Sequence, residues 1–426
     1  MAAATVTIPP ATAQIDYADL YARWERGNWC ATEIDLSQDR IDWHERMTAE
    51  QRRGALWLFS LFFHGEDAVA DTLSPYVDAA PLQEQKYFLT TQQVDEARHS
   101  VLFKRFMHEV VGVGDGSVGG TLRATMPELT WGHRQTFGYL DDMAARLRRS
   151  PDDRRLLASA ITLYHVMIEG GLAQAGQHTI EGILDRLDLL PGFREGMRQV
   201  SNDEQRHIAF GVRVLADLYA EDPQPIQDAI VGTFREVLPL STCVAQIPDW
   251  DLSYTRALGY ELEDLFEEGA RMQEARLRAI GLPLDDVPNF PLPLDVPPRE
   301  RGERGIKLMK AQYLGPKEGA FVADDEATEI LFDQMRRQVV PEHAEPGTVI
   351  QWDFTDAEPW HLVIDDGRTR VARGRAPRPS LVLRSTLEDW VDVTAGRADP
   401  ARLMLRRRLR ARGQLRLLLR LPKLFA

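Results

Sequence analysis

The chain has 426 residues, 44% of them apolar and 27% charged, as expected of a globular protein with a sizeable core. Its net charge is −14, and residues 1–400 hold all 65 acidic residues against 42 basic ones, which argues against nucleic acid as a partner. Two cysteines exclude a disulfide framework. Without a secretory signal or an apolar run of about 20 residues, we expect a cytoplasmic protein with no membrane span.

The first 280 residues are predicted to be mainly helical. The capping box at Thr48–Gln51 opens an apolar run at helical spacing that includes Glu66. Ser74-Pro75 is expected to end or kink this helix, and Pro81 to lie in the first turn of the next one, which carries Glu96. Four more helices are predicted: around 154–180, after 191–192, around 224–239 and around 254–278.

The composition of the sequence and its predicted secondary structure change after residue 282. Six prolines within 283–298 predict a connecting arm, for which we set the bounds 283–319. Beyond it, one helical stretch precedes alternating segments and a hairpin turn at 365–367. The predicted elements are a helix at 325–337, strands at 349–354, 360–364, 369–373 and 380–384, and a helix at 387–393. We therefore predict a helical domain over 1–282 and a small α+β domain over 320–426.

The end of the chain is basic, with nine basic residues and no acidic ones between 401 and 426. Such a tail either touches anionic lipid headgroups or is the solvated face of a last element, and the second interpretation is favoured.

One five-residue pattern, Asp-Glu-x-Arg-His, occurs twice, at Asp95–His99 and Asp203–His207. Positions i and i+3 of a helix share a face, so the Glu and His of each copy can reach one metal ion. A further glutamate lies in an apolar segment upstream of each copy, Glu66 before the first and Glu169 before the second. Four helices that give Glu, Glu-x-x-His, Glu and Glu-x-x-His supply the ligands of a dinuclear iron or manganese site. The predicted metal ligands are Glu66, Glu96, His99, Glu169, Glu204 and His207.

Four buried carboxylates would balance two divalent cations, and two imidazoles complete a ligand set suited to iron or manganese. Asp95 and Asp203 are each predicted to hydrogen-bond the other pair's histidine and fix its tautomer. Asp67 could replace its neighbour Glu66 as the ligand, although Glu66 is preferred. His165 is either a seventh ligand or, preferably, a core histidine. The structural alternative is a bundle with buried ion-pair networks and no metal.

With these motifs, residues 15–280 resemble the ribonucleotide reductase small-subunit superfamily, and within it the R2-like ligand-binding oxidases. Gly65–Val69 and the position of Tyr164, five residues before Glu169, add to the match. The resemblance implies a ferritin-like bundle with a mixed manganese/iron site, or alternatively a di-iron site. It further implies reaction with O2, a long-chain fatty acid or other lipid at the metals, an unknown electron donor and a homodimer. It also implies a tyrosine–valine ether cross-link, for which Val69 and Tyr164 stand at the matching positions, although core packing explains either residue alone.

Other members of the superfamily fit less well. Phe103 occupies the position of the radical tyrosine of a reductase subunit, although a tyrosine-free reductase class also has phenylalanine there. Arylamine N-oxygenases would have a histidine at Val200. Acyl desaturases share the ligand types but match the flanking motifs poorly.

Residues 320–426 resemble a sterol-carrier-protein-2-type lipid-binding domain through Gln351–Phe354, Trp360–Gly367 and the leucine-rich Gly413–Phe425. A generic α+β domain is the alternative. The sequence thus predicts an O2-activating dinuclear metal oxidoreductase that binds a hydrophobic ligand, with a lipid-binding C-terminal domain. The alternatives are a tyrosyl-radical-free reductase small subunit and a non-catalytic lipid-binding protein with a structural metal site.

Overall fold

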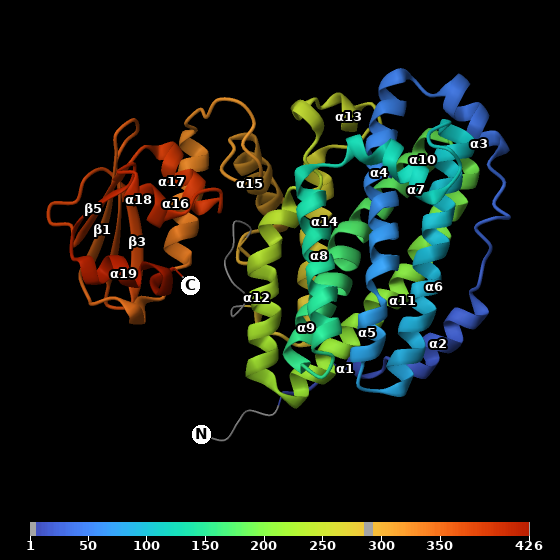
Figure 1. The fold of residues 1–426 in the computed structure, drawn as a ribbon, viewed down its shortest axis with the longest axis horizontal. Helices are drawn as coiled ribbons and strands as arrows, with labels where there is room; N and C mark the ends of the chain where they lie inside the picture. Colours follow the sequence, from blue (N-terminus) through green and yellow to red (C-terminus); the bar gives the residue numbers. More distant parts are fainter. Residues whose placement is uncertain (1–5, 285–292, 426) are drawn as a thin grey trace. The chain divides into compact units, whose positions relative to one another are not determined.

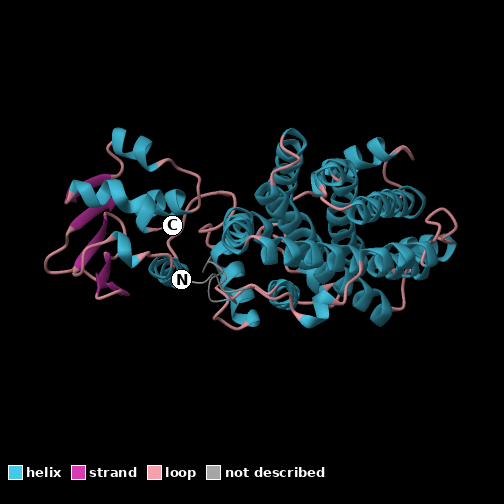
Figure 2. Cartoon of the chain, turned by 90° about the horizontal axis from the view of Figure 1, so that it is seen from below, coloured by secondary structure: helices cyan, strands magenta, loops and turns pink. Residues whose placement is uncertain are grey.

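The computed structural model describes residues 6–284 and 293–425. The chain divides into two compact units, the first comprising Met1–Val287 and Pro297–Gly302, the second Pro288–Val296 and Glu303–Ala426. The described part of the first unit is helical, and the five strands all lie in the second (Figures 1 and 2). The predicted fold class, a mainly helical protein with a C-terminal α+β part, is therefore confirmed.

The helices of the first unit follow one another through short connections. The α-helices are α1 (Pro10–Ala13), α2 (Tyr17–Arg26), α3 (Ser37–Ile41), α4 (Ala49–Thr72), α5 (Ser74–Ala79), α6 (Gln83–Arg105), α7 (Val118–Thr125), α8 (Trp131–Arg149), α9 (Arg154–Ile161), α10 (Gln174–Leu187), α11 (Pro191–Glu221), α12 (Pro223–Thr242), α13 (Ser253–Arg256) and α14 (Leu262–Ile280). Between them lie the π-helices η1 (Asp42–Arg46), η2 (Phe106–Val111) and η4 (Thr162–Ala173), and the 3-10 helices η3 (Met126–Glu128) and η5 (Pro248–Trp250). Helices α1, α2, α3, α7 and α8 were not predicted from the sequence, and the helix predicted around 254–278 is divided into α13 and α14.

The first helix boundaries follow local chemistry. The Thr48 hydroxyl accepts a hydrogen bond from the Gln51 N–H and the Gln51 side chain accepts one from the Thr48 N–H, which is the predicted capping box. The predicted break at Ser74-Pro75 is also present, since α4 ends at Thr72 and α5 begins at Ser74. The placement of Pro81 was wrong. Pro81 lies just before α6, whose N-cap is Leu82. The Leu82 N–H donates to the Gln85 side-chain oxygen at 3.3 Å, so the helix begins after Leu82 and does not include Pro81.

The core of the first unit consists of α4, α6, α11 and the continuous stretch α9–η4–α10. The last was predicted as a regular helix but is π-helical for twelve residues. A glycine allows α11 to approach it, because a Cβ at Gly211 would lie 2.2 Å from the His165 Cβ. Among the described residues, this stretch (Arg154–Leu187) alone is long and apolar enough to cross a membrane. However, 83% of its most apolar window is buried, as expected of a core helix.

The second unit contains a mixed sheet in the order β3-β2-β1-β4-β5, in which β1 pairs with β4 in parallel and the other pairs are antiparallel. Its strands are β1 (Thr348–Phe354), β2 (Trp360–Asp365), β3 (Arg368–Arg373), β4 (Leu381–Ser385) and β5 (Arg410–Gly413). Its helices are α16 (Asp325–Arg337), α17 (Leu387–Thr394), α18 (Pro400–Leu405) and α19 (Leu415–Leu424). The predicted hairpin turn is present, with Asp366 and Gly367 both at positive φ.

Aromatic side chains from the sheet and its helices form the core of the second unit. Phe332 of α16 stacks on Trp360 with ring centroids 4.6 Å apart, and Trp352 lies 5.6 Å from Trp390 of α17. The expected connecting arm, 283–319, contains a helix that the sequence did not predict, α15 (Pro298–Lys310). Pro298 fits there because the first position of a helix needs no N–H donor. The prolines within 285–292 lie outside the described residues.

Candidate metal centre

The structure brings the six predicted ligands together in two overlapping groups. One consists of Glu66, Glu96, His99 and Glu204, and the other of Glu96, Glu169, Glu204 and His207. Within each group the nitrogen and oxygen atoms that could bind a metal all lie within 4.8 Å of one another. All six side chains are buried. Glu96 and Glu204 belong to both groups, which is the arrangement of two metal positions bridged by two carboxylates.

The two histidines are held by crossed aspartates. His99 Nε2 lies 3.2 Å from Asp203 Oδ2, and His207 Nε2 lies 3.1 Å from Asp95 Oδ2. Each aspartate thus hydrogen-bonds the histidine of the other motif, as predicted. An aspartate at Nε2 retains the proton there and leaves Nδ1, the atom nearest the glutamates, free to bind a metal.

Arginines and tryptophans surround the two aspartates. Arg206 bridges Asp95 at 2.9 Å and Asp203 at 2.7 Å, and Arg98 contacts the same two carboxylates. The Trp24 indole N–H donates to Asp95 at 2.9 Å, and that of Trp29 donates to Asp203 at 2.8 Å. The arginine in each motif is therefore part of the site. Neither these arginines nor the two tryptophans were predicted as site residues from the sequence.

The charges of the cluster are unbalanced. Burial raises the pKa of Glu66 to about 8, and burial together with the charge of Glu204 raises the pKa of Glu169 well above its usual range. Burial lowers the pKa of His99, but the carboxylates of Glu66, Asp203 and Glu96 outweigh it and hold this pKa well above normal. Protons thus supply the positive charge that the cluster needs, a role that divalent cations fulfil equally well.

Several of these buried atoms lack a hydrogen-bond partner among the described residues. They are Oε2 of Glu96, Glu169 and Glu204, and Nδ1 of His207. A buried polar atom without a partner costs about 1–3 kcal/mol, so one such cluster is unfavourable unless another group binds there. Three carboxylate oxygens and one imidazole nitrogen are donors that iron and manganese accept.

Asp67 and His165, which the sequence left as alternative or additional metal ligands, have different surroundings. Asp67 belongs to neither group, and its Oδ1 accepts a hydrogen bond from Ser100 at 3.3 Å. His165 is also outside both groups, and burial lowers its pKa to about 3, so its ring is neutral. His165 Nε2 lies 3.1 Å from Gln92 Oε1, and Gln92 in turn donates to Glu169 at 2.7 Å. Gln92 was not predicted as a site residue, although its spacing of four residues before Glu96 places it on the same helix face.

The structure also places the residues that distinguish members of the superfamily. The Tyr164 hydroxyl donates to Glu96 Oε1 at 3.0 Å, and burial raises the pKa of this tyrosine well above normal. Val69 is buried on α4. Phe103 packs between the rings of Phe62 and Phe193, at 6.0 and 5.4 Å, and brings no hydroxyl to the cluster.

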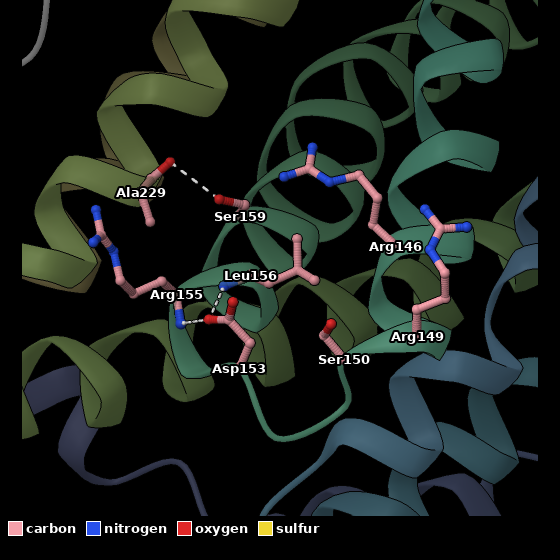
Figure 3. A pocket seen from close by; sticks show the side chains of 8 residues that line it. All are labelled: Arg146, Arg149, Ser150, Asp153, Arg155, Leu156, Ser159 and Ala229. Carbon is pink, nitrogen blue, oxygen red and sulfur yellow. Dashed lines mark hydrogen bonds between the residues drawn. The ribbon is translucent and has the colours of Figure 1, made fainter.

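A surface hollow lies apart from these residues, where α8, α9 and α12 meet (Figure 3). Its volume is about 450 Å³ and three arginines project around it. The lining residues are Arg146, Arg149, Ser150, Asp153, Arg155, Leu156, Ser159 and Ala229. None of the six predicted ligands lines this hollow.

Comparison with known proteins agrees with the geometry. Residues 12–240 match the family described as "Ribonucleotide reductase, small chain", and residues 340–426 match the "SCP-2 sterol transfer family". The R2-like ligand-binding oxidase of Sulfolobus acidocaldarius is 24% identical, with a TM-score of 0.53 over 67% of this chain and 93% of that one.

Two further structures are similar at 25% identity over 62% of this chain and 93% of theirs. One is an R2-like ligand-binding oxidase with an aerobically reconstituted Mn/Fe cofactor, with a TM-score of 0.55. The other is a variant of that oxidase with an aerobically reconstituted Fe/Fe cofactor, with a TM-score of 0.54. The family match covers more than half of the chain, which therefore belongs to the ribonucleotide reductase small-chain family and carries an SCP-2-type segment at its C-terminus.

Proposed function

We propose that the protein is an O2-activating dinuclear oxidase of the R2-like type, with a manganese/iron or a di-iron site. A long-chain fatty acid or another hydrophobic ligand would bind at the metals, and the C-terminal unit would bind lipid. The observation that carries this proposal is the pair of ligand groups that share Glu96 and Glu204. Two metals so bridged are typical of enzymes that activate O2 in helical bundles.

The donor set fits such a metal pair. Glu66 and His99 would hold one metal, Glu169 and His207 the other, and Glu96 with Glu204 would contact both. When bound, the metal pair would supply the electrons that reduce O2. The partnerless carboxylate oxygens and the raised pKa values of Glu66 and Glu169 support this assignment, because cations would satisfy the former and replace the protons in the latter.

The chain's own groups would orient the ligands and exclude water. Asp95 and Asp203 hold the proton on each Nε2, and Gln92 directs one oxygen of Glu169. Aromatic rings cover the cluster, with Trp29 stacked 6.2 Å from His99 and Phe88 edge-on at 6.3 Å from His207. A dry site of this kind prevents side reactions with solvent.

The resemblance to the oxidases also leads us to propose an ether between the Tyr164 oxygen and the Val69 side chain. Its formation would remove one hydrogen from each residue and pass two electrons to O2. The hydrogen bond of Tyr164 to Glu96 supports this role, because it places the phenol at the cluster. Tyr76, whose ring lies 5.4 Å from that of Tyr164, provides a control position.

The test is to load the protein with manganese and iron, expose it to O2, and measure O2 uptake, bound ligand and peptide masses. We expect two metals per chain, a co-purifying hydrophobic ligand, and a two-hydrogen mass loss on a linked Val69–Tyr164 peptide. Tyr164→Phe should abolish the mass loss, whereas Tyr76→Phe should retain it. Full metal loading with neither O2 uptake nor mass loss would contradict the oxidase and leave a structural metal site.

A radical-storing reductase subunit is the second candidate, supported by the family match over residues 12–240. Phe103 means that it would have to be of the tyrosine-free type. Rescue of a strain that lacks its reductase small subunit would favour this candidate. We further propose that the protein is a cytoplasmic homodimer, and light scattering would measure its oligomeric state. We also propose that it receives electrons from a separate reductase, which a pull-down would detect.

A further inference from the structure

The C-terminal helix α19 has one face fixed to the second unit and one face free. Leu417 and Leu424 are buried, and Phe425 packs edge-on against Trp352 at 6.4 Å. The backbone N–H of Val340 donates to the Leu424 carbonyl oxygen at 2.8 Å, and α19 contacts β4 and β5. These contacts fix the rotation of the helix and therefore decide which residues face solvent.

The free face is basic and also carries an apolar side chain. Arg416, Arg420 and Lys423 are exposed at spacings of four and three residues, so they form one stripe. None of the three forms an ion pair with any described residue. Leu419 borders this stripe and is 82% exposed. An exposed leucine beside a basic stripe is typical of helices that lie on a membrane surface.

The surroundings strengthen the positive charge. No acidic residue occurs within 401–426, although the whole chain carries a net charge of −14. Within this segment the exposed basic residues beyond α19 are Arg402, Arg406, Arg407, Arg408, Arg410 and Arg412. Only Arg402 and Arg408 among these have an acidic partner in the described structure. Because the rest of the chain is acidic, an anionic surface would repel it and attract the basic segment 401–426, so this segment would face the surface.

We propose that the outward face of α19 docks the protein on the surface of an anionic lipid bilayer. Arg416, Arg420 and Lys423 bind lipid phosphate and carboxylate groups, and Leu419 enters the headgroup region. This inference goes beyond the proposed function, since it concerns a bilayer surface and neither the metal cluster nor the lipid binding proposed for the second unit. A lipid carrier gains from such a surface because its cargo is nearly insoluble in water and is exchanged at membranes.

The test is flotation of the full-length protein with vesicles of phosphatidylcholine, with or without phosphatidylserine. We expect binding only to the vesicles with phosphatidylserine, and release at high salt, because exposed charges are screened. Each basic residue near an anionic surface contributes about fivefold to binding, so R416Q/R420Q should bind roughly 30-fold more weakly. L419Q should lose roughly tenfold, because it removes the apolar contact.

The matched control is R368Q/R370Q. Both residues are exposed on β3, the edge of the sheet opposite β5, and neither forms an ion pair with a described residue. This variant removes the same charge from the same unit and should keep wild-type binding. Equal losses in the two double variants, or no preference for phosphatidylserine, would overturn the proposal. So would no vesicle binding at all, as expected if α19 docks on an acidic protein. None of these results depends on metal loading or O2 uptake.

Discussion

The half of the metal cluster around His99 and the half around His207 have the same inner contacts. Each histidine has an aspartate from the other motif at its Nε2, within 3.1–3.2 Å. Each of these aspartates accepts a tryptophan N–H and contacts both motif arginines. The repeated sequence motif therefore builds a nearly symmetric centre from α6 and α11.

The two halves differ where the upstream glutamates enter. Glu66 lies on the regular helix α4, and its one described hydrogen-bond partner is His99, at 3.1 Å. Glu169 lies on the π-helix η4, which also brings Tyr164 and His165 to the cluster. The repeated motif on α6 and α11 therefore gives the two halves the same inner contacts, whereas the π-helix η4 makes the surroundings of Glu169 different from those of Glu66. Two unlike metals would thus find two unlike positions.

The largest effect is expected where the halves join. Glu204→Gln should weaken the binding of both metals by more than about 100-fold, because this carboxylate belongs to both ligand groups. Compared with the metal-free wild type, the metal-free variant should unfold at a similar or higher temperature, because burial and the nearby Glu96 carboxylate already raise the pKa of Glu204 and disfavour its charge. Elemental analysis and thermal unfolding test these expectations, with Glu181→Gln on α10 as control. A fully loaded Glu204→Gln protein would show that the halves are not bridged there.

Two adjacent substitutions separate the halves. Glu66→Gln should lose the metal near His99 and keep the metal near His207. Asp67→Asn should bind both metals, because only Glu66 lies in the cluster. Elemental analysis of the two variants, side by side, decides the matter. If Asp67→Asn instead loses a metal, the assignment of the ligand on α4 is wrong.

Gln92 should matter more to the His207 half, because its amide donates to Glu169 at 2.7 Å and only at 3.3 Å to the shared Glu96. Gln92→Leu leaves Glu169 without its donor and should weaken the metal site near His207 by about 10- to 100-fold, and the other site less, as is usual when an orienting hydrogen bond is lost. Its neighbour Gln93 donates to the backbone oxygen of Ala70 instead, so Gln93→Leu is the control. Competition with a chelator measures both. Weakening of the two metal sites by the same factor would mean that the halves are not distinct.

The smallest effects test the symmetric part. Trp24→Phe and Trp29→Phe each remove one indole hydrogen bond to an aspartate, and should lower the free energy of unfolding by about 1 kcal/mol. Trp29 also stacks on His99, so urea denaturation should show for Trp29→Phe a loss equal to or larger than that for Trp24→Phe. No loss in Trp24→Phe would show that the indole hydrogen bonds of the two aspartates are not equivalent.

The sequence predicted much of this arrangement because helical periodicity and the motif repeat are local signals. The crossed hydrogen bonds of Asp95 and Asp203 followed from the duplication alone. The π-helix was not predictable, since nothing in 162–173 except its glycines departs from an ordinary apolar helix. The tryptophans were missed as site residues because their partners lie on other helices, at sequence separations of 71 and 174 residues. Gln92 lies one turn before Glu96 on the same helix, but its partner Glu169 is 77 residues away, and helical spacing alone does not reveal that contact.

The central claim is that six side chains from four helical segments hold two bridged metal ions. The most direct measurement is electron paramagnetic resonance, combined with elemental analysis, on protein loaded with manganese and iron. The account predicts two metals per chain with magnetically coupled spins, and loss of the coupling in Glu204→Gln. A protein that takes up no metal, or one whose two metals show no coupling, would contradict it.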